Sequence, residues 1–108
     1  ENVQVDEISK NIIYVTYLGN KEVRNEAIKL AELLRSEGIP VGLELMERSI
    51  SAQLKHASRI GARFCVIIGE DELDRDVVVI KNMETGEQVE FEKNFVVNGI
   101  KDMIQEMQ

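Results

Sequence analysis

Two apolar segments in the second half of the chain are joined by a very short link, and this link constrains the fold more than any other feature. Residues 63–68 (RFCVII) and 77–83 (VVVIKNM) are rich in β-branched side chains, as strands typically are. The eight residues 69–76 lie between them. A crossover between parallel strands needs about a dozen residues or more. We therefore predict that these two strands pair antiparallel.

The first half of the chain contains strand-like segments separated by a helix-length one. Residues 12–18 and 41–46 are predicted strands. Asn20 is a suitable N-cap for a helix between them, and Gly38 followed by Pro40 is typical of a helix C-terminus. One face of this helix has the spacing of a buried stripe, formed by Val23, Ala27, Leu30, Ala31 and Leu34.

A second helix is predicted before the strand at 63–68. Ser49 or Ser51 can cap its first turn, and Gly61 ends it. Its expected apolar stripe is formed by Ile50, Leu54, Ala57 and Ile60 or Gly61. Both helices are long enough for right-handed crossovers, so the first three strands are predicted to run parallel.

The remaining residues complete an α/β domain. Residues 84–87 are a predicted tight turn with Gly86 where φ must be positive, and residues 88–91 return as a fifth strand. From Asn94 a last helix is marked by Val97, Ile100, Ile104 and Met107. The result is a five-stranded mixed sheet with helices on both faces. Its core is expected to include Ile13, Val15, Leu30, Leu34, Leu54, Val66, Ile68 and Val79.

Charge is distributed unevenly along the chain. The net charge of −7 argues against a broad DNA-coating surface. Residues 48–63 nevertheless carry four fixed positive charges and no acid, and these are Arg48, Lys55, Arg59 and Arg63. A basic helix face is more often a solvated surface than a binding site. It also permits a small nucleic-acid site held by a local patch.

Other features restrict the class of protein. The lone Cys65 excludes an internal disulfide and fits a reducing, cytoplasmic location, and it is expected to be a small buried hydrophobe. No apolar run approaches the roughly 20 residues of a membrane helix. Residues 1–11 are polar and are interpreted as a linker from a preceding domain. No nucleotide-loop, zinc or nucleophile motif is present, so neither catalysis nor a cofactor is expected in this domain.

Three loops are expected at the carboxyl edge of the parallel strands, where open sheets bind ligands. They are residues 17–19, 47–49 and 69–72, and they bring together an arginine, a helix N-terminus and a group of carboxylates. Such donors and acceptors suit the edges of splayed-out bases, guanine above all. Arg48 and Ser49 can equally be a loop and a helix cap, and 70–72 a polar turn.

Residues 48–72 carry a resemblance to a known family. Their sequence, RSISAQLKHASRIGARFCVIIGEDE, resembles the C-terminal anticodon-binding domain of class II aminoacyl-tRNA synthetases, and within it most closely the histidyl enzymes. The motifs IYVTYLG, LRSEGIPV and ETGEQ are also similar, so the resemblance spans about residues 12–106. It implies an anticodon-binding domain over 12–108, with a three-layer α/β/α fold, strand order 2-1-3-4-5 and strand four antiparallel.

The resemblance also implies a function. The domain would bind the anticodon stem-loop of histidine tRNA, and an ATP- and Mg-dependent catalytic domain would reside elsewhere in a parent chain that forms homodimers. Carried over by motif, the RNA-binding candidates are Arg48, Ser49, Gln53, Lys55, Glu70 and Glu72, with Lys81 as a weaker one.

Two positions depart from the family pattern. Glu47 stands where glycine is common, and Ser51 where lysine is frequent, and both lower the positive charge. These departures leave room for a relative that kept the fold and changed or lost the tRNA role, and two other interpretations stay open. One is a regulatory or paralogous synthetase-like domain that uses the fold for protein contact, and the other is a small-molecule-binding doubly wound domain.

Overall fold

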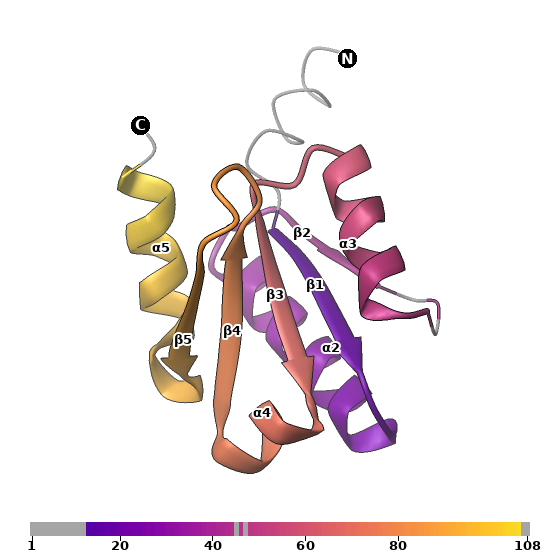
Figure 1. The fold of residues 1–108 in the computed structure, drawn as a ribbon. Coiled ribbons are helices and arrows are strands. Elements are labelled where there is room, and N and C mark those ends of the chain that lie inside the picture. The colour runs from indigo at the N-terminus through magenta and orange to yellow at the C-terminus, as the bar shows by residue number, and fades with distance from the viewer. Residues whose placement is uncertain (1–12, 45, 47, 107–108) are drawn as a thin grey trace.

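A computed structural model describes residues 13–44, 46 and 48–106, which form a sheet with helices on both faces (Figure 1). The predicted linker, Ile12, Glu47 and Met107 lie outside the described residues. The elements are β1 (Ile13–Leu18), α2 (Lys21–Ser36), β2 (Val41–Leu43), α3 (Ile50–Arg59), β3 (Phe64–Gly69), α4 (Glu70–Arg75), β4 (Val77–Asn82), β5 (Gln88–Glu92), the 3₁₀ turn η1 (Lys93–Phe95) and α5 (Val96–Glu106).

The sheet has the order β2-β1-β3-β4-β5, with β1 parallel to both of its neighbours. β3 and β4 pair antiparallel, with Phe64 opposite Asn82 and Ile67 opposite Val79, so the prediction from the short link is confirmed. The link itself folds into α4, a helix of six residues. β5 returns antiparallel to β4 after a turn in which Gly86 has a φ of 82°.

The ends and the buried face of α2 are those predicted from the sequence. The Asn20 side chain accepts hydrogen bonds from the N–H groups of Glu22 and Val23, which satisfies two donors that the helix leaves free. Gly38, with a φ of 82°, follows the helix in the left-handed conformation. The buried residues of α2 are the five predicted ones, Val23, Ala27, Leu30, Ala31 and Leu34.

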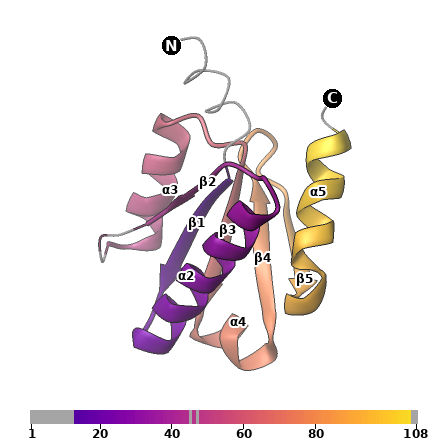
Figure 2. The same ribbon diagram turned by 180° about the vertical axis from the view of Figure 1, so that it is seen from behind.

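The two faces of the sheet are covered unequally. α2 and α5 lie on one face, where the larger core forms between them and the strands (Figure 2). α3 lies on the other face, beside β1 and β2 (Figure 1), above a smaller cluster of Tyr14, Ala57, Ala62 and Cys65. Within the part of the chain that the structure describes, none of the helices is long and apolar enough to span a membrane.

Two of the residues predicted to be buried in the core are less buried than expected. Leu54 and Val79 are half-buried, whereas the other six predicted residues are buried. Val79 and its neighbour Ile67 face the α3 side of the sheet, and α3 does not extend across β4 and β5 (Figure 1). The alternation of the strand indicated which side chains share a face, but it carried no information on how far a helix covers that face.

Candidate nucleic-acid interface

Gln53 fixes the start of α3 to the end of β1. Its side-chain amide donates to the carbonyl oxygens of Tyr17 and Arg48, both at 2.8 Å, and its oxygen accepts from the Tyr17 N–H at 3.0 Å. Gln53 is buried, with 1% of its surface exposed. β2 ends at Leu43, earlier than the predicted Met46. The amide of Gln53 therefore supplies the partners that a longer β2 would have offered to Tyr17.

Arg48 is held by a buried carboxylate. Its Nε and Nη2 atoms donate to the two oxygens of Glu44, each at 2.9 Å, which is the bidentate arrangement of a strong charge-assisted pair. The Glu44 side chain is fully buried and that of Arg48 is 30% exposed. The guanidinium therefore has one edge against the protein, and the Arg48 side chain as a whole stays partly open to solvent.

Two further groups fix the Glu44 carboxylate. The Tyr14 hydroxyl donates to Oε1 at 2.7 Å, and the Met46 N–H donates to Oε2 at 3.2 Å. The hydrogen bond from Arg48 is the main cause that lowers the pKa of Glu44 below its ordinary value, and it outweighs burial. Burial and the neighbouring Glu44 raise the pKa of Tyr14. Glu44 is therefore ionised and Tyr14 is neutral at physiological pH.

A shallow depression lies beside Arg48 at the carboxyl edge of the sheet. Its volume is ≈ 330 Å³, and its lining consists of Tyr17, Leu18, Gly19, Arg48 and Ser49. Glu70 lies against Gly19, because a Cβ built on that glycine would come within 3.3 Å of the Glu70 Oε2 atom. An arginine and a carboxylate thus stand at the same edge, as the sequence predicted.

The first turn of α3 adds positive potential to this depression. The Ser49 side chain caps the helix by accepting from the Ala52 N–H at 3.2 Å, so Ser49 rather than Ser51 is the cap. No acidic residue lies in the first turn. Lys55 and Arg59 are exposed farther along α3. Cationic side chains and a helix N-terminus are the groups that meet phosphates in nucleic-acid complexes.

Similarity to known proteins agrees with this geometry. A family model described as an anticodon binding domain matches residues 3–103. The chain belongs to the anticodon-binding domain family.

Individual relatives share nearly the full length of this anticodon-binding domain. A histidine–tRNA ligase of Fervidobacterium nodosum is 67% identical over 100% of the chain, which covers 26% of that protein. A histidine–tRNA ligase of Thermosipho africanus is 50% identical over 97% of the chain and 25% of that protein. The chain therefore spans about a quarter of the length of the curated relatives it matches.

Solved structures show the same fold. The apo histidyl-tRNA synthetase of S. aureus superposes with a TM-score of 0.77 at 33% identity, over 84% of this chain and 27% of that one. The histidyl-tRNA synthetase from Nostoc sp. PCC 7120 superposes with a TM-score of 0.78 at 29% identity, over 89% of this chain and 23% of that one.

Two predicted site residues of the anticodon-binding domain lie away from Arg48. Glu72 accepts from the Gly69 N–H at 2.8 Å and lines a pocket on the other face of the sheet. Lys81 is half-buried in β4 opposite Cys65, which lies near the start of β3 and thus far from its carboxyl end. Cys65 is fully buried as predicted, and burial raises the pKa of its thiol to about 12.

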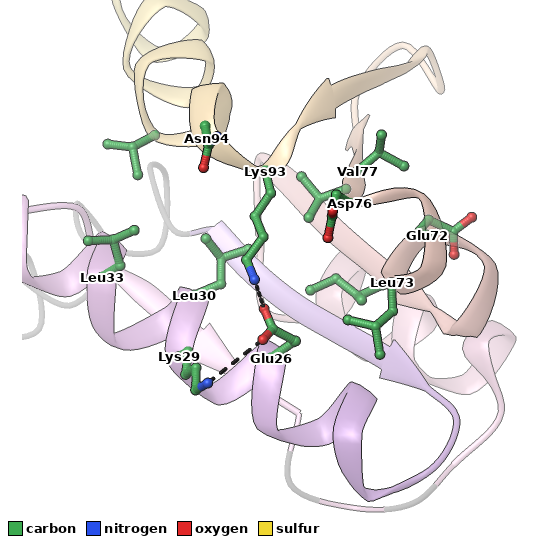
Figure 3. Close-up of a pocket in the computed structure, with 13 residues that line it drawn as sticks. Glu26, Lys29, Leu30, Leu33, Glu72, Leu73, Asp76, Val77, Lys93 and Asn94 are labelled. Atoms are coloured by element: carbon green, nitrogen blue, oxygen red, sulfur yellow. Dashed lines mark ion pairs between the residues drawn. The ribbon is translucent and has the colours of Figure 1, made fainter.

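The pocket that Glu72 lines is distinct from the depression at Arg48. It has a volume of ≈ 260 Å³ and lies between α2, α4, the start of β4 and η1 (Figure 3). Leu30, Ile68 and Val97 are among its apolar residues, and an ion pair of 2.7 Å between Lys93 and Glu26 crosses its rim. In the described ranges, no cluster of three or more histidine, cysteine or acidic side chains could hold a metal.

Sequence reasoning missed Glu44 and Tyr14. Their signals are weak, since they amount to an acid four residues before an arginine and a tyrosine in a buried strand. It also did not identify the burial of Gln53. A clearer signal existed there, because Gln53 lies three residues after Ile50 and four before Ala57, on the apolar stripe of α3.

Proposed function

We propose that this chain is the part of a histidine–tRNA ligase that recognises the anticodon stem-loop of histidine tRNA. The observation that carries the proposal is the fixed guanidinium of Arg48 in a depression at the carboxyl edge, within a domain whose similar proteins are histidine–tRNA ligases. Unstacked loop bases are what RNA-binding modules read most specifically, and they need rigid donors and acceptors.

The proposed contacts divide into two classes. Arg48 and Glu70 contact base edges, because an arginine donates to base acceptors and a carboxylate accepts from base N–H groups. Lys55 contacts the phosphate backbone, and Ser49 keeps the N-terminus of α3 at the depression. Gln53 acts as a positioning residue, since its polar atoms are committed to Tyr17 and Arg48.

Glu72 and Lys81 have different roles in the proposal from Arg48 and Glu70. Glu72 stabilises the start of α4, from which Glu70 projects, through its bond to the Gly69 N–H. Lys81 would meet RNA only if the bound loop extended across the uncovered face of β4. The proposal does not require a direct contact from either residue.

The proposal extends to the parent protein. Aminoacylation with ATP and Mg would take place in a catalytic domain outside this chain, in a homodimer located in the cytoplasm. The domain described here would supply binding and selectivity without chemistry of its own. Purified domain should therefore neither activate histidine nor hydrolyse ATP.

Binding to RNA hairpins tests the proposal directly. The domain is titrated with the anticodon stem-loop of histidine tRNA and with stem-loops of altered anticodon, at two salt concentrations. We expect the cognate loop to bind more tightly, and Arg48→Ala or Glu70→Ala to reduce that preference about tenfold. The control is Lys101→Ala, since Lys101 pairs with Glu37 away from the depression.

The same experiment distinguishes anticodon recognition from the regulatory alternative. If wild type binds cognate and altered loops equally, or if Arg48→Ala has no effect on either, anticodon recognition at this site is wrong. A regulatory domain that uses the fold for protein contact would then account better for the net charge of −7.

A further inference from the structure

The guanidinium of Arg48 is fixed along one edge and open along another. Nε and Nη2 form a side-on pair with the two Glu44 oxygens. A guanidinium has five N–H groups in one plane, so two are occupied and three remain. Two of the three, one from Nη1 and one from Nη2, point in parallel along the outer end of the side chain. Among the described residues, Nη1 donates no hydrogen bond.

The buried carboxylate of Glu44 sets the orientation of this outer end of Arg48. Glu44 is 1% exposed and cannot follow Arg48 outward without breaking its bonds to Tyr14 and Met46. A buried carboxylate that lost Arg48 would remain uncompensated in a medium of low polarity, which is strongly unfavourable. The pair therefore stays closed, and the edge of Arg48 that faces Glu44 is not available to a ligand. The Arg48 side chain is 30% exposed and lines the depression at the carboxyl edge.

From this geometry we infer that Glu44 is a positioning residue that aims the outer edge of Arg48 at the O6 and N7 atoms of one guanine. The inference rests on the proposed function and names the base that the site reads. Two parallel donors match two adjacent acceptors, which guanine presents as O6 and N7. Adenine presents an acceptor beside a donor at the same place, so one of the two Arg48 hydrogens would face an N–H group.

Two adjacent phosphate oxygens could also satisfy the outer edge of Arg48, and base analogues separate the two cases. Histidine codons are CAU and CAC, so the anticodon that pairs with them is GUG and contains two guanines. In the stem-loop, each guanine is replaced in turn by 7-deazaguanine, which lacks the N7 acceptor, or by inosine, which keeps both O6 and N7. Neither change affects the phosphates.

Wild type is measured first with these modified stem-loops, because this comparison does not depend on whether a protein variant folds. At one of the two positions we expect 7-deazaguanine to weaken binding about tenfold, the equivalent of one lost base hydrogen bond, and inosine to weaken it less. If 7-deazaguanine binds like guanine at both positions while altered anticodons are still rejected, the inference is overturned and the proposed function stands. Equal binding of cognate and altered anticodons overturns both.

The role of Glu44 is then tested with Glu44→Gln, which keeps the shape but loses the charge and one acceptor. We expect the preference for guanine over 7-deazaguanine to fall to near unity, while binding to all loops keeps its salt dependence. Glu37→Gln is the matched control, since it also breaks a carboxylate–cation pair, the exposed one with Lys101, and it should retain the preference. A variant Glu44→Gln that keeps the preference shows that Glu44 does not position Arg48.

Tyr14→Phe provides a second, milder variant. It removes the 2.7 Å hydrogen bond to Oε1 of Glu44 and leaves the ion pair intact. The preference for guanine over 7-deazaguanine should fall partway between wild type and Glu44→Gln. Unfolding by urea is followed for each variant, so that a loss of selectivity in a folded protein is distinguished from a loss of the fold. If folded Tyr14→Phe keeps an unchanged preference, the proposal that Tyr14 acts on Arg48 through its hydrogen bond to Glu44 is contradicted.

Discussion

The side-chain amide of Gln53 takes the place of a peptide group beside Tyr17. It accepts from the Tyr17 N–H and donates to the Tyr17 carbonyl, as the backbone of a neighbouring strand would. It also donates to the carbonyl of Arg48, the residue two positions before α3 begins. One buried polar side chain therefore joins the end of β1, the loop that carries Arg48 and the first turns of α3.

The substitution Gln53→Leu should lower the free energy of unfolding by about 1–3 kcal/mol, or more if several groups stay unpaired. The reason is that the N–H of Tyr17 and two carbonyls would lose their partner while still buried. Urea unfolding measures the change. Ser51→Ala, an exposed substitution in the same helix, should remain within about 0.5 kcal/mol of wild type. An equally small change for Gln53→Leu would contradict the role given to the amide.

Arg48→Ala should weaken the pH dependence that Glu44 contributes to the free energy of unfolding. In wild type the pKa of Glu44 is lowered, so its stabilising contribution is present above the pKa of the unfolded chain and is lost as pH falls through the folded-state pKa. Without Arg48 the largest cause that lowers this pKa is lost, and burial is then opposed only by the hydrogen bonds from Tyr14 and Met46, so the pKa of Glu44 rises above its wild-type value. The difference in unfolding free energy between wild type and variant should therefore narrow between about pH 7 and about pH 4.

The measurement is a set of urea curves across that range, with Arg24→Ala as the control. Arg24 is exposed on α2, and its removal should give a difference from wild type that changes little with pH. A gap for Arg48→Ala that widens on acidification would show that Glu44 is not the group responsible.

Leu34 and Leu33 form a matched pair in α2. Leu34 is fully buried in the larger core, whereas Leu33 is 46% exposed. Leu34→Ala should cost about 2–5 kcal/mol of unfolding free energy, as other buried leucines do. Leu33→Ala should cost clearly less, and Leu54→Ala should fall between the two because Leu54 is half-buried. Thermal or urea unfolding ranks the three. A cost for Leu33→Ala equal to or above that for Leu34→Ala would mean that α2 is turned about its axis, whereas the cost for Leu54→Ala reports on α3.

Lys55→Ala should weaken binding to all RNA loops by the same factor and reduce the slope of log affinity against log salt by about 1. This is the behaviour of a phosphate contact, and it differs from that expected for Arg48. Lys29→Ala is the control, since Lys29 is exposed on α2 near Glu26, on the opposite face of the sheet. Loss of anticodon preference in Lys55→Ala would place Lys55 at a base instead.

The parts of the fold that could be predicted are those with local physical causes. The cap at Asn20, the apolar stripe of α2 and the eight-residue link each fix a boundary or a direction without knowledge of distant residues. The end of β2 could not be predicted in this way. It depends on Gln53, which lies in another element and replaces the strand with its side chain.

The candidate site was predicted in outline and not in detail. The sequence placed Arg48 and Glu70 at the carboxyl edge because strand direction determines which loops meet. It could not show that Arg48 is held by Glu44, since the burial of that carboxylate and its hydrogen bond from Tyr14 join residues 30 positions apart in the sequence. Glu72 and Lys81 were grouped with Arg48 by motif, although their side chains lie elsewhere.

The short β2 has a consequence for how the protein behaves at high concentration. An edge strand with free N–H and C=O groups is a template on which another chain can add a strand, and this is a common route to aggregation. β2 offers three residues, and beyond it the Gln53 amide occupies the backbone groups of Tyr17. The side chain that orders the candidate site thus also shortens the length of β-sheet that a misassembled partner could extend.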